Sequence, residues 1–129
     1  DIHLESFKKL GATVIEKDEV VFDLTYKESK ANTNYTLAFD VTTPGTYQIS
    51  LTASSELGEL AQLPCTLSVM GIPIASFVFN GSGGKEVTIT KEIPCSQRFL
   101  VSRLFVASNG LKLKDFKIKF INDKVVYFN

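Results

Sequence analysis

The sequence of 129 residues has no tryptophan, one histidine, two cysteines and no net charge. The single histidine, His3, lies almost at the terminus, so we expect neither a Ser-His-Asp nor a Cys-His catalytic set. Cys65 and Cys95 are too few for a disulfide scaffold and too far apart for a zinc knuckle. We expect two small buried side chains, with a single disulfide as the alternative in an oxidising compartment.

The charge balance argues against several classes of partner. Fourteen basic and fourteen acidic side chains cancel, which leaves no overall attraction to nucleic acid or to an anionic membrane. No run of about eighteen apolar residues is present, so we expect no membrane-spanning helix. The acids include no evident pair in an apolar setting, which glycosidase chemistry requires. The sequence therefore argues against an enzyme, and a stand-alone hydrolase is the least favoured function.

The chain shows a strict alternation of apolar and polar residues over long stretches. From Asn34 to Ala53 this alternation predicts two strands that are joined by a tight hairpin turn at Pro44-Gly45. The chain begins at Asp1 without a leader, as expected of a mature or excised fragment. Residues 2–10 fit neither strand nor helix clearly. Further strands are predicted at 12–16, 20–25, 62–69, 72–79, 85–93, 97–108, 111–121 and 124–128.

Details of these strands suggest how they are arranged. Residues 72–79 are apolar at nearly every position, which is typical of a strand covered on both faces or bent by a bulge. Pro94 favours a sheet edge. Asn80–Gly84 and Ser108–Gly110 predict hairpin turns, and Met70-Gly71 predicts a tight connection. Roughly nine or ten short strands without a convincing helix predict one all-β domain over residues 1–129, an antiparallel β-sandwich or barrel.

Sugar binding needs an aromatic face flanked by amides or carboxylates. Tyr26 stands at the edge of the polar stretch Tyr26–Asn34, which we interpret as a long loop. We predict Asn34, Glu56 and Asn109 as polar partners on loops. The alternatives are that Tyr26 folds back on the core and that Asn109 is a turn former in Asn-Gly.

Two acids are candidates for a metal site. Glu5 lies near the first strand and Asp115 near the start of a late strand, and hard cations such as calcium take carboxylate oxygens. The alternative is that both are solvated surface acids.

Several segments resemble the galactose-binding-like jelly roll of carbohydrate-binding modules of families 6 and 35. They are Pro44–Tyr47, Thr66–Gly71, the Gly81–Gly84 turn and Asn109–Ile118, and the resemblance covers about residues 1–121. It implies a non-catalytic module with a structural calcium between Glu5 and Asp115, and a sugar cleft among loops at one end that includes Tyr26. Phe7 stands where the family usually has a second acid, and Leu113 stands where it usually has an asparagine.

We therefore expect a monomeric, secreted or cell-surface module that binds polysaccharide or oligosaccharide beside a catalytic domain of the same chain. Its predicted contacts are Tyr26, Asn34, Glu56 and Asn109, with neither nucleic acid nor membrane as a partner. The alternative is a structural or protein-interaction β-sandwich that braces a neighbouring catalytic domain and binds no sugar.

Overall fold

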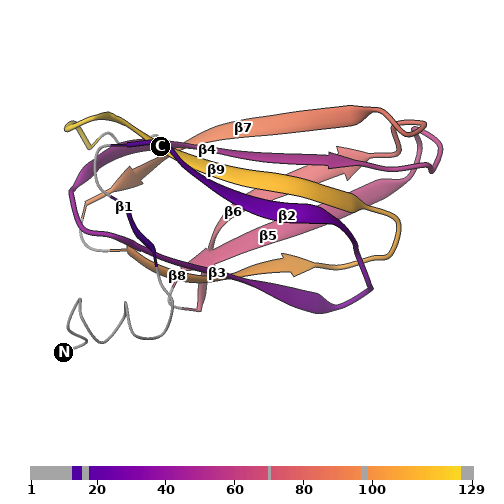
Figure 1. Cartoon of the computed structure of the whole chain (residues 1–129), viewed down its shortest axis with the longest axis horizontal. Coiled ribbons are helices and arrows are strands. Elements are labelled where there is room, and N and C mark those ends of the chain that lie inside the picture. The colour runs from indigo at the N-terminus through magenta and orange to yellow at the C-terminus, as the bar shows by residue number, and fades with distance from the viewer. Residues whose placement is uncertain (1–12, 16–17, 70, 97–98, 126–129) are drawn as a thin grey trace.

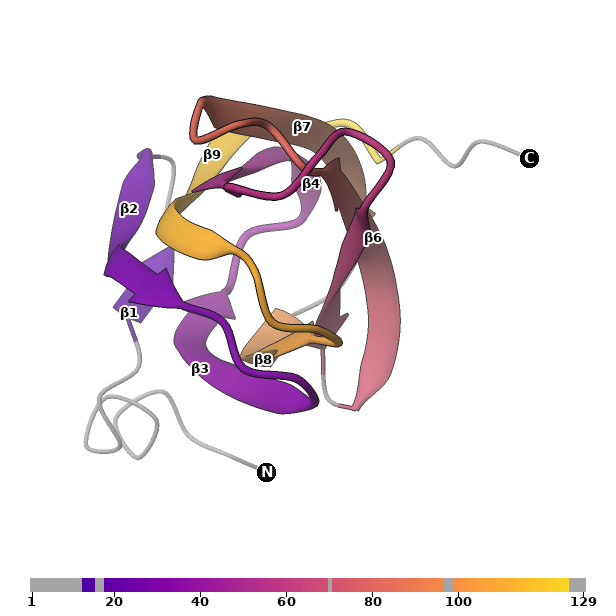
Figure 2. The same ribbon diagram turned by 90° about the vertical axis from the view of Figure 1, so that its right-hand side faces the viewer.

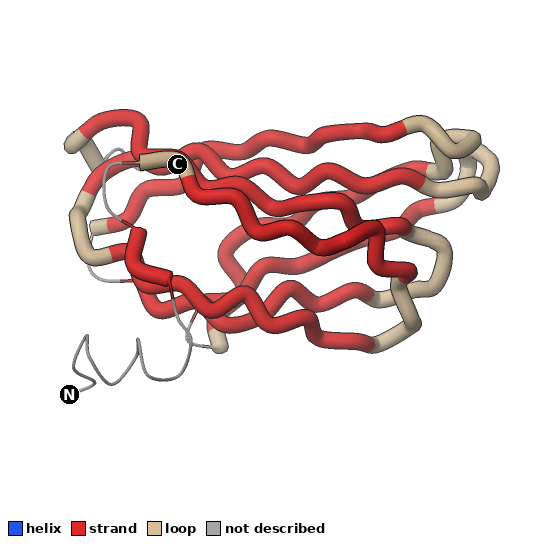
Figure 3. The backbone as a smooth tube through the Cα atoms, viewed as in Figure 1, coloured by secondary structure: helices blue, strands red, loops and turns tan. Residues whose placement is uncertain are grey.

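The computed structural model describes residues 13–15, 18–69, 71–96 and 99–125, and over this part of the chain it forms nine β-strands and no helix (Figures 1 and 3). This confirms the all-β prediction. The same residues accordingly contain no helix able to cross a membrane. The strands are β1 (Thr13–Ile15), β2 (Val20–Glu28), β3 (Thr33–Val41), β4 (Gly45–Ser54), β5 (Gln62–Val69), β6 (Ile72–Asn80), β7 (Glu86–Cys95), β8 (Phe99–Val106) and β9 (Lys112–Asn122).

The strands form two sheets that face each other, as the end-on view in Figure 2 shows. One sheet has the order β1-β3-β8-β5-β6 and the other the order β2-β9-β4-β7. All neighbours are antiparallel except β1 and β3, which are parallel. The predicted antiparallel β-sandwich is therefore confirmed, with one short parallel pair in addition.

Alternation along the strands fills the space between the sheets. In β4, Ile49, Leu51 and Ala53 are all fully buried, whereas Ser50 faces outward. An aromatic cluster links the two sheets: the Phe39 and Phe116 rings stack with centroids 6.1 Å apart and planes 15° apart. Phe22 and Phe77 pack around the Phe116 ring, at 6.3 and 6.5 Å. Burying each such ring contributes about 1.5–3 kcal/mol.

All three turns that were predicted as hairpins join different sheets. The turn at Pro44-Gly45 links β3 to β4, Gly81–Gly84 links β6 to β7, and Ser108–Gly110 links β8 to β9, and each passes from one sheet to the other. Only β5 and β6, which are joined through Gly71, are paired neighbours among these connections. The hairpin predictions were wrong because a turn that reverses the chain has the same residues whether it returns to its own sheet or crosses.

The predicted loop Tyr26–Asn34 is also shorter than expected. β2 continues to Glu28 and β3 already begins at Thr33, so four residues separate the strands. The end of β2 and the start of β3 carry exposed polar side chains, so their sequence resembles that of a loop. Residues 124–125 are not in a strand, and the rest of the predicted strand 124–128, like 2–10, lies outside the described residues.

The predictions for β6 and β7 were partly right. β6 is an edge strand with a bulge opposite Leu67 and Ser68, but it is not covered on both faces, because Ile72 and Val78 are exposed. β7 is the edge of its sheet, as Pro94 indicated, and pairing with β4 continues through that proline.

Both cysteines are buried free thiols, as expected from the sequence, and they form no disulfide. Burial raises the pKa of each thiol from 9.0 to about 12. Burial, with a smaller contribution from Cys95, also raises the pKa of Tyr47 from 10.0 to about 12. These groups remain neutral in the folded chain at a pH where they ionise in the unfolded chain. Their contribution to stability is complete below pH 9 and is lost as the pH rises towards about 12.

We expect Cys65 and Cys95 to resist thiol reagents in the folded chain near about pH 8 and to react fully in denaturant, because only the thiolate is nucleophilic. A colorimetric thiol assay with and without urea measures both values. Rapid labelling of the native chain, or no free thiol in denaturant, would contradict the buried, unpaired assignment.

Candidate functional site

Four connections gather at one end of the sandwich, on the right in Figure 1. They are residues 29–32, 55–61, 81–85 and 107–111, and together they are called the rim here. Each connects a strand of one sheet to a strand of the other. The crossing pattern therefore brings segments from both halves of the chain to one place.

Ser29 joins the first of these connections to the last. Its hydroxyl donates to the carbonyl oxygen of Ser108 (2.9 Å) and accepts from the amide of Leu111 (3.0 Å). The Ser29 amide donates to the carbonyl oxygen of Leu111 (2.8 Å). Beside it, Oδ1 of Asn109 accepts from the amide of Ala31 (2.7 Å). The Asn109 side chain thus has a bracing role, in line with the turn-former alternative.

Ser55 and Ser82 join the other two connections in a similar way. The Ser82 hydroxyl accepts from the amide of Ser55 (3.0 Å) and lies 2.6 Å from the carbonyl oxygen of Lys85, to which it donates. The amide of Gly84 donates to the carbonyl oxygen of Ser55 (2.8 Å). A Cβ atom at Gly81 would collide with the backbone carbonyl of Leu57, so a glycine is required where the two loops touch. These contacts position Glu56.

A pocket of about 310 Å³ opens at the rim. Its walls combine carboxylates, an ammonium, an amide and aliphatic groups, which are Glu28, Ser29, Glu56, Leu57, Asn109, Gly110, Leu111 and Lys112. The structure therefore brings together two of the predicted contact residues, Glu56 and Asn109. Such a set offers hydrogen-bond donors and acceptors at the mouth of a small open hollow.

Tyr26 lies on a strand rather than on a loop, and its backbone departs from regular β geometry. Thr25 and Tyr26 both have a φ of +54°, which is rare for residues other than glycine. The pairing of β2 with β9 is irregular here, between Asp23 and Lys27. The amide of Thr25 donates to Oδ1 of Asp23 (2.8 Å), which supports the irregular turn. Tyr26 is 54% exposed, so the alternative that it folds back on the core is wrong.

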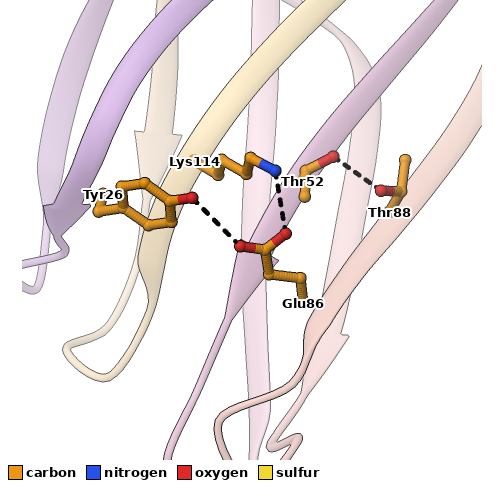
Figure 4. Close-up of polar contacts among 5 residues, drawn as sticks. All are labelled: Tyr26, Thr52, Glu86, Thr88 and Lys114. Carbon is orange, nitrogen blue, oxygen red and sulfur yellow. Dashed lines mark hydrogen bonds and ion pairs between the residues drawn. The ribbon is translucent and has the colours of Figure 1, made fainter.

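The Tyr26 ring extends over the outer face of the β2-β9-β4-β7 sheet, as Figure 4 shows. Its hydroxyl donates to Oε2 of Glu86 on β7 (3.4 Å). Nζ of Lys114 on β9 donates to the other oxygen of Glu86 (3.0 Å). This hydrogen bond and the charge of Glu86 raise the pKa of Lys114. Tyr26, Glu86 and Lys114 thus form a polar bridge across the sheet; Tyr26 itself does not line the rim pocket.

The remaining predicted residues lie elsewhere. Asn34 is on β3, not on a loop, and is paired with Phe105 on β8. Both belong to the sheet opposite that of Tyr26, and Asn34 does not line the pocket. Leu113 is fully buried in the core. Asp115 lies on β9 opposite Asp23, and its Oδ1 is buried without a hydrogen-bond partner. Glu5 lies outside the described residues, within which no three His, Cys, Asp or Glu side chains are grouped to hold a metal ion.

Sequence reasoning missed the charged residues of the site, Glu28, Glu86, Lys112 and Lys114, and the buried serine Ser29. All of them stand within a few residues of a strand end, where polar residues are common whatever their role. Glu86 and Lys112 stand directly after predicted turns, and this position gave a weak indication that they lie near the loops of the site. Nothing in the sequence indicated that the side chain of Glu86 meets that of Tyr26, because their strands are separated by two others.

Comparison with known proteins finds a curated relative that is much longer than this chain. No protein-family model matches the sequence. A β-glucosidase from Ruminococcus albus is 35% identical over 110 residues, which are 84% of this chain and 11% of that enzyme. The chain therefore spans about a ninth of the curated relative that it matches.

Solved structures with the same fold include carbohydrate-binding modules. The C-terminal family 6 module of the laminarinase LamC from Zobellia galactanivorans has a TM-score of 0.66 at 11% identity, over 79% of this chain and 99% of that one. The family 35 module of Abf62 from Cellvibrio japonicus has a TM-score of 0.62 at 11% identity, over 86% and 98%. A Paenibacillus barengoltzii β-glucosidase has a TM-score of 0.61 at 14% identity, over 83% of this chain and 11% of the enzyme.

The chain thus has the galactose-binding-like β-sandwich fold of carbohydrate-binding modules of families 6 and 35, as the sequence motifs predicted.

Removing the Ser29 hydroxyl tests how the rim is held together. We expect Ser29→Ala to lower the free energy of unfolding by about 1–3 kcal/mol, because the amide of Leu111 loses its acceptor in a buried setting. Urea unfolding measures the change. Ser76→Ala, at an exposed position on β6, is the matched control and should change it by less than about 0.5 kcal/mol. Equal effects would contradict the bracing role of Ser29.

Proposed function

We propose that this chain is a non-catalytic carbohydrate-binding module of a glycoside hydrolase, and that the Tyr26 ring is its stacking platform. The observation that carries the proposal is the outward turn of Tyr26. Two consecutive residues with positive φ are each unfavourable by about 1–3 kcal/mol, and such strain is concentrated at functional sites. Here the strain exposes an aromatic ring two residues before Glu28, which lines the rim pocket.

The chemistry around the ring suits a neutral sugar. The apolar face of a pyranose stacks on an aromatic ring, while its hydroxyls need donors and acceptors at the edge. Glu86 contacts both Tyr26 and Lys114, and Glu56 and Asn109 line the rim pocket. The polar bridge restrains the ring before a ligand arrives, which lowers the entropy cost of binding.

The exposed position of the pocket acids supports a binding role over catalysis. Glu28 and Glu56 are both exposed. Glycoside hydrolysis needs a carboxylic acid whose pKa is raised, which usually follows from burial in an apolar pocket. The similarity to carbohydrate-binding modules supports the same conclusion. The proposal extends to a monomer in a secreted or cell-surface enzyme, where polysaccharide is encountered.

Substitution at Tyr26 tests the platform. We expect Tyr26→Ala to weaken oligosaccharide binding at least about tenfold, or about 1.4 kcal/mol, because the stacking surface is removed. Tyr26→Phe keeps the ring and loses only the 3.4 Å contact to Glu86, so it should bind within about threefold of the wild type. Titration calorimetry with cello-, laminari- and xylo-oligosaccharides measures the affinities.

Val21→Ala is the control for the Tyr26 variants, because Val21 is a half-exposed residue on the same strand. It should leave the affinity unchanged. No binding to any oligosaccharide of the panel would refute the carbohydrate function, and equal binding by Tyr26→Ala would refute the role of Tyr26.

We also propose that a calcium ion binds at Asp115. The support is the buried Oδ1 of Asp115, which has no hydrogen-bond partner, since an unsatisfied carboxylate oxygen is costly and hard cations prefer such ligands. Glu5 remains the predicted second ligand. The ion would neutralise the carboxylate between β2 and β4 and so stabilise the sheet.

Calcium titration tests this site. We expect calcium at about a hundredfold excess over its Kd to stabilise the wild type by about 3 kcal/mol, and Asp115→Asn to lose that gain. Thermal unfolding with calcium or chelator measures it. Asp123→Asn, at an exposed acid, is the control and should respond like the wild type. No stabilisation of the wild type, or full stabilisation of Asp115→Asn, would contradict the site.

A further inference from the structure

The two sheets differ sharply in their number of charged residues. The four strands β2, β4, β7 and β9 contain eleven charged residues, which are Asp23, Lys27, Glu28, Glu86, Lys91, Glu92, Lys112, Lys114, Asp115, Lys117 and Lys119. The four long strands of the other sheet, β3, β5, β6 and β8, contain two, Asp40 and Arg103. Asp40 is fully buried. An outer face that meets only water has no reason to be so poor in charge.

The outward side chains of this second sheet form a continuous surface, called the neutral face here. Phe105 lies at its centre, partly exposed, with Asn34 on one side and Thr66 on the other in register. Thr66 is paired in turn with Ser76, and Pro64 with Val78. The neutral face consists of Asn34, Thr36, Pro64, Thr66, Ser68, Ser76, Val78, Phe105 and Arg103, and Arg103 is the one charged residue among them.

The edge of the neutral face lacks the charged residues that usually protect an edge strand against pairing, although Pro73 and the bulge opposite Leu67 and Ser68 offer some protection. Edge strands normally carry charges that discourage another strand from binding. β2 and β7, the edges of the other sheet, have three charged residues each, and β1 is only three residues long. β6 has none in nine residues. Instead it exposes Ile72 (64%) and Val78 (49%).

We propose that the neutral face and the β6 edge dock against a neighbouring domain of the same polypeptide. The inference rests on that part of the proposed function which makes the chain a module of a larger glycoside hydrolase. In both β-glucosidases that it resembles, the matching region is 11% of the chain, so most of each enzyme lies outside that region. The buried centre of a protein interface is depleted of charge, as this face is, and Phe105 supplies an aromatic ring at its centre.

A protein surface fits the neutral face better than a sugar does. Sugar and cofactor sites are hollowed, and the pocket at the rim is lined by none of the residues of the neutral face. Docking here would leave free both the rim and Tyr26, which lies over the outer face of the opposite sheet. The module would then be attached through one sheet and meet its ligand with the other sheet and the rim.

Two matched valines test the proposal. Val78 is 49% exposed on β6 and Val21 is 50% exposed on β2, and both are on edge strands. Val78→Lys and Val21→Lys are made in the full-length polypeptide and in the 129-residue chain, which encloses its own core. Differential scanning calorimetry then follows unfolding of the module. We expect Val78→Lys to lower its Tm by at least about 4 °C in the full-length polypeptide only, and Val21→Lys to leave both unchanged.

Three results would overturn the docking proposal. Val78→Lys without effect in the full-length polypeptide would mean that the face is free. Equal losses in both contexts would mean that the substitution acts within the module. Dissociation of a dimer of the short chain by Val78→Lys, seen by analytical ultracentrifugation, would assign the face to a second copy.

Oligosaccharide affinity separates this proposal from the carbohydrate function. Val78→Lys should bind the ligands of the wild type equally well, and a loss of affinity would identify the neutral face as a sugar surface and overturn the docking proposal. A wild type that binds no oligosaccharide refutes sugar binding, yet leaves the comparison of Tm values between the two contexts valid.

Discussion

The contact on which the rest of the structure depends is the aromatic packing between the sheets. Phe39 on β3 and Phe116 on β9 stack across the interior, with Phe22 and Phe77 against the second ring. Because both sheets bury one face against this cluster, consecutive strands can alternate between sheets and still satisfy their apolar sides. The crossing connections are then forced to the ends of the sandwich, and that is where the rim and its pocket arise.

Given this rigid frame, the molecule can tolerate strain where it is useful. Thr25 and Tyr26, which have positive φ angles, interrupt the regular pairing of β2 with β9, and the hydrogen bond between Asp23 and Thr25 offsets part of the cost. The result is an aromatic ring on the surface, whose hydroxyl donates to Glu86, which in turn accepts from Lys114. The same frame separates two faces of different character, one charged and one neutral, which suits a module that meets two different partners.

The fold was largely predictable from the sequence, whereas the site was not. Alternation through Ile49, Leu51 and Ala53 predicted a strand and its buried face correctly, because burial on one side imposes that period. Sheet membership could not be predicted, since a crossing turn and a hairpin turn have the same residues. The exposure of Tyr26 was predicted for the wrong reason: an irregularity within a strand, not a loop, exposes it, and its contact with Glu86 depends on pairings across two intervening strands.

NMR chemical-shift mapping of the chain during titration with an oligosaccharide tests whether a sugar contacts Tyr26 and the rim without contacting the neutral face. We expect shifts at Tyr26, Glu86 and the loops that carry Glu56 and Asn109, with Thr66 and Phe105 unaffected. Shifts centred on Phe105, or none at all with ligand in large excess, would contradict this expectation.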